Sequence, residues 1–243
     1  MGGHKLSGFL QQNGSILMVI TLDGPAGSGK STAAKIIAQK LSLNQIDSGA
    51  IYRSFTYMCI RYAQEHQKDP AEVIDSDGFK KYISQQNLRI EFQGGRQFVT
   101  LNQEDMENHI RKPEITKNIK MVADARYIRE EVNRRIGKLS GDYSIIADGR
   151  DMGTVVFPDA DFKFFLTASL DVRALRRFEE FKRQNPNITI EQVKAEIDQR
   201  DQDDQNREFG SLKPAQNAIF VDTTNLELNG VVNVIVNIIQ KKQ

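Results

Sequence analysis

The segment GPAGSGKS, residues 24–31, has the residue types and spacing of a loop that binds phosphate groups. Its glycines allow backbone N–H groups to turn toward phosphate oxygens, and a helix that follows adds a partial positive charge. Lys30 is expected to reach the outer phosphates of a nucleoside triphosphate, and Ser31 to bind Mg²⁺. A chance match is the alternative, but the apolar run before the loop and the helical pattern after it argue against chance. The residues predicted to bind the donor nucleotide are Gly24, Pro25, Ala26, Gly27, Ser28, Gly29, Lys30, Ser31 and Thr32.

A second group of reactive side chains follows the apolar residues 145–147. Asp148, Arg150 and Asp151 stand where a buried strand is expected to end, and charges there are costly unless a partner or ligand satisfies them. Asp148 is expected to hold the Mg²⁺ of a bound nucleotide, directly or through water. A turn or helix-capping aspartate is the alternative.

The elements that must position these residues can be read from the apolar pattern. Short apolar runs predict strands at 16–23, 43–47, 143–148, 162–168 and 218–222. Helical spacing predicts helices from the phosphate loop to residue 41 and over 49–66, 114–139 and 228–239, with others starting near 170 and 189. Alternation around Gly94-Gly95 predicts a hairpin over 88–102. Strands that alternate with helices predict an α/β fold with a parallel sheet.

The composition narrows the possible partners. A formal net charge of +1 over 243 residues gives no reason to expect nucleic acid or a membrane surface as a partner. The single cysteine, Cys59, favours a reducing compartment, and we expect a cytoplasmic protein. Residues 1–15 lack the apolar core of a signal peptide and are expected to be a disordered tail or a cloning remnant.

Four segments in one order resemble the bacterial cytidylate kinase family, which phosphorylates CMP and dCMP with ATP. They are LDGPAGSGKST (22–32), DSGAIYR (47–53), DGRDMGTVVFPDA (148–160) and RDQDDQNR (200–207), and the resemblance runs from about residue 16 to the end. It implies a monomer with one P-loop kinase domain, 16–243, that uses ATP with Mg²⁺. It also implies a nucleoside monophosphate (NMP) binding segment at about 48–112 and a lid at about 170–186, both expected to close over substrates.

The resemblance assigns roles to charged residues around the acceptor. Arg53 and Arg150 would clamp the phosphate of CMP, since paired guanidinium contacts suit a phosphate held in line with the donor. Asp151 would accept from the cytosine amino group, with Arg129 donating to the ring acceptors, so that uracil is left unsatisfied. The residues predicted to bind CMP are Ser48, Tyr52, Arg53, Lys120, Arg129, Arg150, Asp151, Arg200, Asp204 and Arg207.

One position departs from the family pattern. Lys120 stands where the family usually has a serine that contacts the base, so Lys120 or a nearby residue such as Thr116 would take that contact. The lid helix offers Arg176, Arg177 and Arg183 for the transferred phosphate, although a solvated basic face is the alternative. Residues predicted to be catalytic are Lys30, Arg150, Arg176 and Arg177.

Two other functions remain open at this point. One is a kinase for another nucleoside monophosphate, such as UMP. The other is a nucleotide-responsive binding module without turnover, which would be favoured if the phosphate-clamping arginines were missing. Arg53, Arg150 and Arg207 are all present, which favours turnover.

Overall fold

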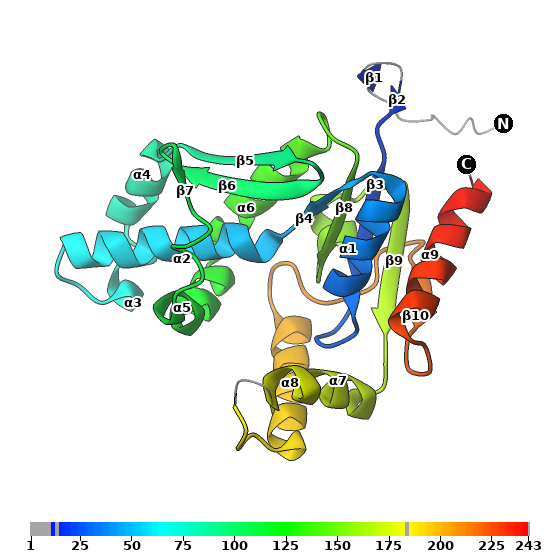
Figure 1. Cartoon of the computed structure of the whole chain (residues 1–243). Coiled ribbons are helices and arrows are strands. Elements are labelled where there is room, and N and C mark those ends of the chain that lie inside the picture. Colours follow the sequence, from blue (N-terminus) through cyan, green and yellow to red (C-terminus); the bar gives the residue numbers. More distant parts are fainter. Residues whose placement is uncertain (1–10, 13–14, 183–184, 243) are drawn as a thin grey trace.

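A computed structural model describes residues 11–12, 15–182 and 185–242 (Figure 1). Its centre is a sheet of five parallel strands in the order β10-β9-β3-β8-β4. The strands are β3 (Val19–Asp23), β4 (Asn44–Ile46), β8 (Ile145–Gly149), β9 (Phe162–Thr167) and β10 (Ile219–Asp222). The α/β fold with a parallel sheet that the sequence predicts is therefore confirmed.

The first predicted strand is longer than the strand in the structure. β3 begins at Val19, and Ile16 belongs instead to β2 (Ser15–Ile16), which pairs antiparallel with β1 (Gln11–Gln12). Residues 1–10 and 13–14 lie outside the described residues, so the predicted tail over 1–15 stays a prediction.

Helices cover both faces of the parallel sheet because its strands carry apolar side chains on both faces. In β8, Ile146 packs in one core cluster with α1 (Lys30–Leu41) and α9 (Leu228–Lys242). Ile145 and Ala147 point the other way and pack in a second cluster with α2 (Ser48–Glu65) and α6 (Arg126–Leu139). The side chains of all three strand residues are fully buried. None of the helices over the described residues is long and apolar enough to cross a membrane.

An insert between β4 and β8 extends to one side of the sheet (Figure 1). After α2 come α3 (Pro70–Val73), α4 (Asp77–Gln85) and an antiparallel sheet of β5 (Leu88–Gln93), β6 (Arg96–Leu101) and β7 (Glu104–Asp105). The predicted hairpin is confirmed, with Gly94 and Gly95 at positive φ in its turn. A turn of this kind needs residues that tolerate the left-handed region, which glycine does without steric cost.

The single helix predicted over 114–139 is wrong. The structure has α5 (Pro113–Asp124) and α6, separated at Ala125, whose ψ of 114° is extended. The apolar period continues across the break, so periodicity alone does not reveal it. The break has polar contacts on both sides. The Arg129 guanidinium on α6 donates to the Ala123 carbonyl, and the Asp124 carboxylate accepts from Arg207.

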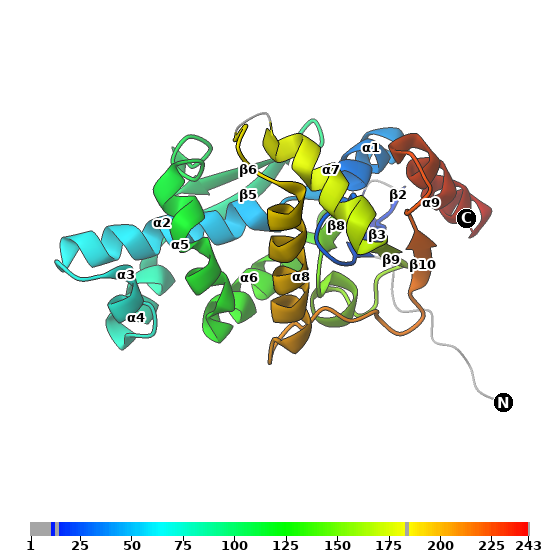
Figure 2. The same cartoon turned by 90° about the horizontal axis from the view of Figure 1, so that it is seen from below.

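The predicted helices near 170 and 189 are α7 (Leu170–Lys182) and α8 (Ile190–Asn206). The Thr189 hydroxyl accepts from the Gln192 backbone N–H, and the Gln192 side chain accepts from the Thr189 N–H, which fixes the start of α8. Seen from below, α7 and α8 lie in front of the edge where β3 and β8 end (Figure 2). In open parallel sheets this carboxyl edge is where ligands bind.

We expect Gly24→Ala to destabilise the fold strongly. A Cβ at Gly24 would lie 2.1 Å from the Leu166 carbonyl oxygen, and φ is +146° there, so β3 and β9 would have to separate. The loss in unfolding free energy should be about 3 kcal/mol, measured by urea unfolding. Gly29→Ala is the matched control because its φ is +85° with no atom within 4 Å of an added Cβ. It should cost only about 1–2 kcal/mol, and equal losses in the two variants would contradict this account.

Candidate active site

The predicted phosphate loop connects β3 to α1 and lines a cleft of about 1200 Å³. Three loop glycines, Gly24, Gly27 and Gly29, have positive φ, which lets the chain curl around the space in front of α1. Residues 26–32 of the predicted donor site line the cleft, whereas Gly24 and Pro25 are not among the lining residues. The first N–H groups of α1 have no partner within the helix, so this end attracts anions.

Lys30 is folded into the loop that carries it. Its ammonium Nζ lies 2.6 Å from the Pro25 carbonyl oxygen and 3.1 Å from the Ser28 hydroxyl, and the residue is buried. Burial, and then the nearby charge of Arg150, lower the pKa of Lys30 well below its usual value. An anion beside the ammonium would relieve both effects, as expected for a residue that binds phosphate.

Ser31 and Asp148 meet at the mouth of the loop. The Ser31 hydroxyl donates to Asp148 Oδ2 at 2.5 Å, and Gln45 Nε2 lies 3.3 Å from Oδ1. Burial raises the pKa of Asp148, which a cation beside the carboxylate would reverse. The described residues hold no cluster of three or more His, Cys, Asp or Glu that could bind a metal. The Ser31 and Asp148 oxygens are ligands of the kind that suit Mg²⁺, which keeps several waters and completes its shell with nucleotide phosphates.

Three arginines predicted to bind the acceptor line the same cleft, and a fourth, Arg207, is linked to Arg150 through Asp204. Arg53, Arg150 and Arg200 line it, and neither Arg53 nor Arg200 has a hydrogen-bond or ion-pair partner within the described part of the chain. Arg150 Nε lies 2.6 Å from Asp204 Oδ2, and Arg207 forms an ion pair with the other oxygen of that carboxylate at 3.0 Å. One buried aspartate thus orients two arginines, and two further guanidinium groups remain available to anions.

The predicted base-reading pair is brought together. Arg129 donates to Asp151 Oδ2 at 2.7 Å, with side chains 6% and 3% exposed, and the Tyr52 ring lies 5.8 Å from the Arg129 guanidinium carbon. Gly210 packs directly on the pair, since a Cβ there would lie 2.1 Å from Asp151 Oδ2. Contact between this pair and a base therefore requires the Gly210 segment to shift, and the base-reading role stays a prediction.

Several other predicted residues have partners within the protein. Lys120 pairs with Asp203 at 2.8 Å on an exposed surface between α5 and α8. Arg176 lines the cleft, but its guanidinium donates to the Thr223 hydroxyl and to the carbonyls of Thr223 and Leu226. Arg177 also lines the cleft and pairs with Glu180. Ser48 is a lining residue, whereas Arg183 lies outside the described residues.

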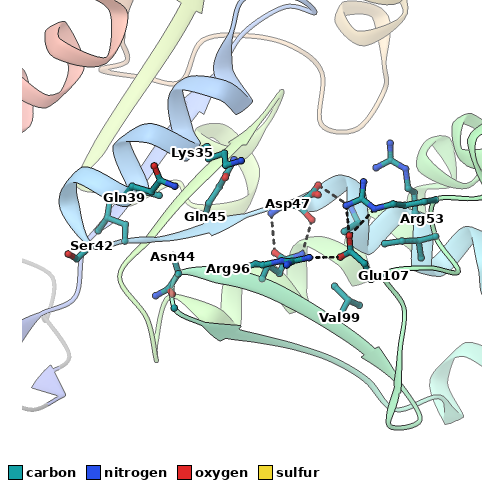
Figure 3. A pocket seen from close by; sticks show the side chains of 18 of the residues that line it. Lys35, Gln39, Ser42, Asn44, Gln45, Asp47, Arg53, Arg96, Val99 and Glu107 are labelled. Carbon is teal, nitrogen blue, oxygen red and sulfur yellow. Dashed lines mark hydrogen bonds and ion pairs between the residues drawn. The ribbon is translucent and has the colours of Figure 1, made fainter. Parts of the chain in front are cut away.

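A second cleft of about 1240 Å³ lies between α1, β4 and β6 (Figure 3). Arg53 and Asp47 line both clefts, so the second one adjoins the first. Glu107 pairs there with Arg96 at 3.3 Å and with Arg111 at 2.6 Å, and Lys35 of α1 also lines this cleft. Thr116 also lines this second cleft. Residues 26–32 of the phosphate loop line the first cleft and not the second.

Several site residues were not found from the sequence. Asp23, at the end of β3, accepts from the backbone N–H groups of Met152 at 2.9 Å and Gly153 at 2.7 Å. Gln45 contacts Asp148, and the buried residues Arg173 and Asp201 contact the backbone of Ala26. Each contact joins residues more than 100 positions apart along the chain, so local spacing carries no signal for it.

Comparisons with known proteins agree with this geometry. The model of the family "Cytidylate kinase" matches residues 20–241. The chain belongs to the cytidylate kinase family.

Two curated family members show how far the likeness extends. "Cytidylate kinase" of Clostridium botulinum (strain Okra / Type B1) is 41% identical over 222 residues, 91% of this chain and 97% of that protein. "Cytidylate kinase" of Bacillus cereus (strain ATCC 10987 / NRS 248) is 42% identical over 224 residues, 90% and 95% of the two chains.

A solved structure of an uncharacterized protein from Eubacterium ventriosum ATCC 27560 has a TM-score of 0.51 at 12% identity. The match covers 92% of this chain and 98% of that one, and at this identity it supports the fold alone.

In this cytidylate kinase family member we expect Asp23 to make stability depend on pH. Burial, opposed by its two backbone hydrogen bonds, raises the pKa of Asp23 to about 6 from 3.8. Because the folded protein holds the Asp23 proton more tightly than the unfolded chain does, Asp23 contributes its full stabilisation below pH 3.8. This contribution is lost as the pH rises through about 6. Between about pH 4.5 and 7 the loss should be about 2 kcal/mol.

Asp23→Asn removes this titration, and urea unfolding at the two pH values measures it. The unfolding free energy of the wild type, minus that of Asp23→Asn, should fall by about 2 kcal/mol between about pH 4.5 and 7. Asp222→Asn is the control, because hydrogen bonds from Thr224 lower the pKa of exposed Asp222 and its effect has the opposite sign. An Asp23→Asn difference that is the same at both pH values would refute the raised pKa.

Proposed function

We propose that this chain transfers the γ-phosphate of ATP to CMP, and to dCMP, giving ADP and the nucleoside diphosphate. The observation that carries the proposal is one cleft that is lined both by the phosphate loop and by Arg53, Arg150 and Arg200. Membership of the cytidylate kinase family supports the same activity. A nucleotide-responsive module without turnover would not need cations for a second phosphate.

The reaction forms one bond and breaks another at the γ-phosphorus. An oxygen of the acceptor phosphate attacks the phosphorus, the bond to the β–γ bridging oxygen breaks, and ADP leaves with the electron pair. Loop N–H groups and Lys30 hold the donor phosphates, while Arg53 and Arg150 hold the acceptor phosphate in line. Most of the rate then comes from positioning and from neutralising charge on the transferred group.

Ser31 and Asp148 would hold Mg²⁺ that arrives with ATP. The ion supplies positive charge that neutralises the phosphate oxygens of the nucleotide. In the structure, Asp148 is oriented by both Ser31 and Gln45, so the carboxylate is already directed toward the mouth of the loop. Gln45 therefore joins the residues that orient the metal site.

Recognition of the acceptor would use the buried network behind Arg150. Asp151 and Arg129 would read the cytosine edge once the Gly210 segment shifts, and Arg200 and Asp204 would contact the sugar hydroxyls. Arg207 would lie near the acceptor phosphate and sugar. Lys120 would reach the base only by leaving Asp203, and the alternative is that another residue such as Thr116 makes that contact.

The lid residues Arg176 and Arg177 would reach the transferred phosphate when the lid closes. Both would first exchange their present partners, Thr223 and Glu180, for phosphate oxygens. We also propose that the protein acts as a monomer in the cytoplasm, as the sequence predicts, and that nucleic acid and membranes are not its partners.

A substrate panel tests the activity. ADP release would be followed by a coupled assay with CMP, dCMP, UMP or AMP as acceptor. We expect kcat/KM for CMP and dCMP to exceed that for UMP and AMP, because Asp151 accepts from the cytosine amino group. Equal turnover of UMP would favour the alternative of a broader monophosphate kinase, and no ADP release with any acceptor would favour the binding module.

We expect Lys30→Ala to remove most turnover and leave the fold intact. The ammonium contacts only the loop that carries it, and it neutralises charge in the transition state, so kcat should fall about a hundredfold or more. Lys35→Ala is the control, since Lys35 is an exposed residue on the next turn of α1 that does not line this cleft. Near-normal turnover by folded Lys30→Ala would rule out the assigned role.

We expect Asp151→Asn to weaken the preference for CMP over UMP. An amide can donate to the uracil carbonyl, whereas the carboxylate only accepts, so the ratio of the two kcat/KM values should fall by about ten- to a hundredfold. If Asp151 only braces Arg129, both substrates should lose the same factor. An unchanged ratio would discard the base-reading role.

A further inference from the structure

The backbone of Ala26 in the phosphate loop is held through both of its polar groups. Its N–H donates to Asp201 Oδ1 on α8 at 3.0 Å, and its carbonyl accepts from Arg173 on α7 at 2.9 Å. Arg173 also donates to the other oxygen of Asp201. The two side chains and the Ala26 backbone therefore form a closed ring of hydrogen bonds between the loop and two helices.

This ion pair is buried, with Arg173 8% and Asp201 6% exposed. A buried pair of charges loses its hydration, so it is weak evidence of added stability compared with well-packed apolar side chains. What the charges provide here is direction, because a carboxylate and a guanidinium fix the orientation of the backbone groups between them. Arg173 Nε also donates to the Ala168 carbonyl just after β9, which fixes the guanidinium against the sheet.

The loop and α7 also approach each other closely. A Cβ at Gly27 would lie 3.0 Å from the Arg173 carbonyl oxygen and 3.1 Å from the Arg173 Cβ. Ala26 packs in a small apolar cluster with Ala174 of α7 and with Val193 and Ile197 of α8. The first turns of α7 and the middle of α8 thus pack against the phosphate loop.

We infer that Arg173 and Asp201 are positioning residues that hold the Ala26 backbone so that the following loop N–H groups face the donor phosphates. Because Asp201 takes the Ala26 N–H, that group is not a phosphate ligand. The inference rests on the proposed binding of ATP by this loop.

The test compares variants by their Kd for ATP, their KM for ATP and for CMP, and their melting temperature. Asp201→Ala frees the Ala26 N–H, and we expect the Kd and KM for ATP to rise about ten- to a hundredfold, as for loss of a charged hydrogen bond. KM for CMP should change less than about threefold. Asp201→Asn keeps an acceptor oxygen, so its Kd for ATP should lie between those of Asp201→Ala and the wild type.

The control is a second ion pair between the same two helices. Lys194 on α8 and Asp171 on α7 form an exposed pair 2.5 Å apart, and neither is bonded to the loop. Asp171→Ala should leave the Kd for ATP and the kinetic constants unchanged. A rise in Kd equal to that of Asp201→Ala would mean that any α7–α8 contact matters, which would overturn the inference.

A double variant separates positioning from stability. Arg173→Met with Asp201→Leu replaces the buried charges with apolar side chains, which often preserves or raises stability. We expect a melting temperature close to wild type, yet a Kd for ATP as high as that of Asp201→Ala. A wild-type Kd in this folded variant would overturn the inference. Wild-type protein that fails to bind ATP would instead refute the proposed function.

Discussion

The site depends on the carboxylate of Asp23, which joins two segments that are 129 positions apart. It ends β3 just before the phosphate loop and accepts the N–H groups of Met152 and Gly153, at the start of the π-helical turn Met152–Val156 after β8. A Cβ at Gly153 would lie 2.8 Å from the Thr21 hydroxyl oxygen and 3.2 Å from this carboxylate, so a side chain there would crowd the contact. The donor loop and the segment after β8, which begins with Arg150, are thereby held at fixed positions relative to each other.

Around the Asp23 contact, most of the buried charged side chains of the site have a partner within the protein. Asp204 is shared by Arg150 and Arg207, Asp151 pairs with Arg129, and Lys30 turns into its own loop. Phosphate oxygens could replace the present partners of Lys30 and Arg150, whereas Arg53 and Arg200 in the same cleft have no partner to release among the described residues. Such exchange keeps the desolvation cost of binding low.

The sequence predicts the central sheet well because buried parallel strands leave continuous apolar runs and the phosphate loop has fixed spacing. The sequence does not predict the break at Ala125, because the helical spacing of apolar residues continues from α5 into α6. The partners of Arg129 and Asp124 on either side of the break are Asp151 and Arg207, which lie far along the chain. The resemblance to the cytidylate kinase family predicts which charged residues belong to the candidate site. It does not predict that Arg173 and Asp201 hold the loop, because that contact exists only after distant segments fold together.

The central claim is that donor and acceptor phosphates meet in line in one cleft. Calorimetry with adenosine and cytidine joined through a pentaphosphate tests it directly, because that ligand spans both sites only if they share the cleft. We expect it to bind at least a hundredfold more tightly than ATP or CMP alone, since its second end binds without a second association cost. Lys30→Ala and Arg53→Ala should each reduce this affinity. Binding no tighter than that of ATP alone, or binding unaffected by Arg53→Ala, would contradict the account.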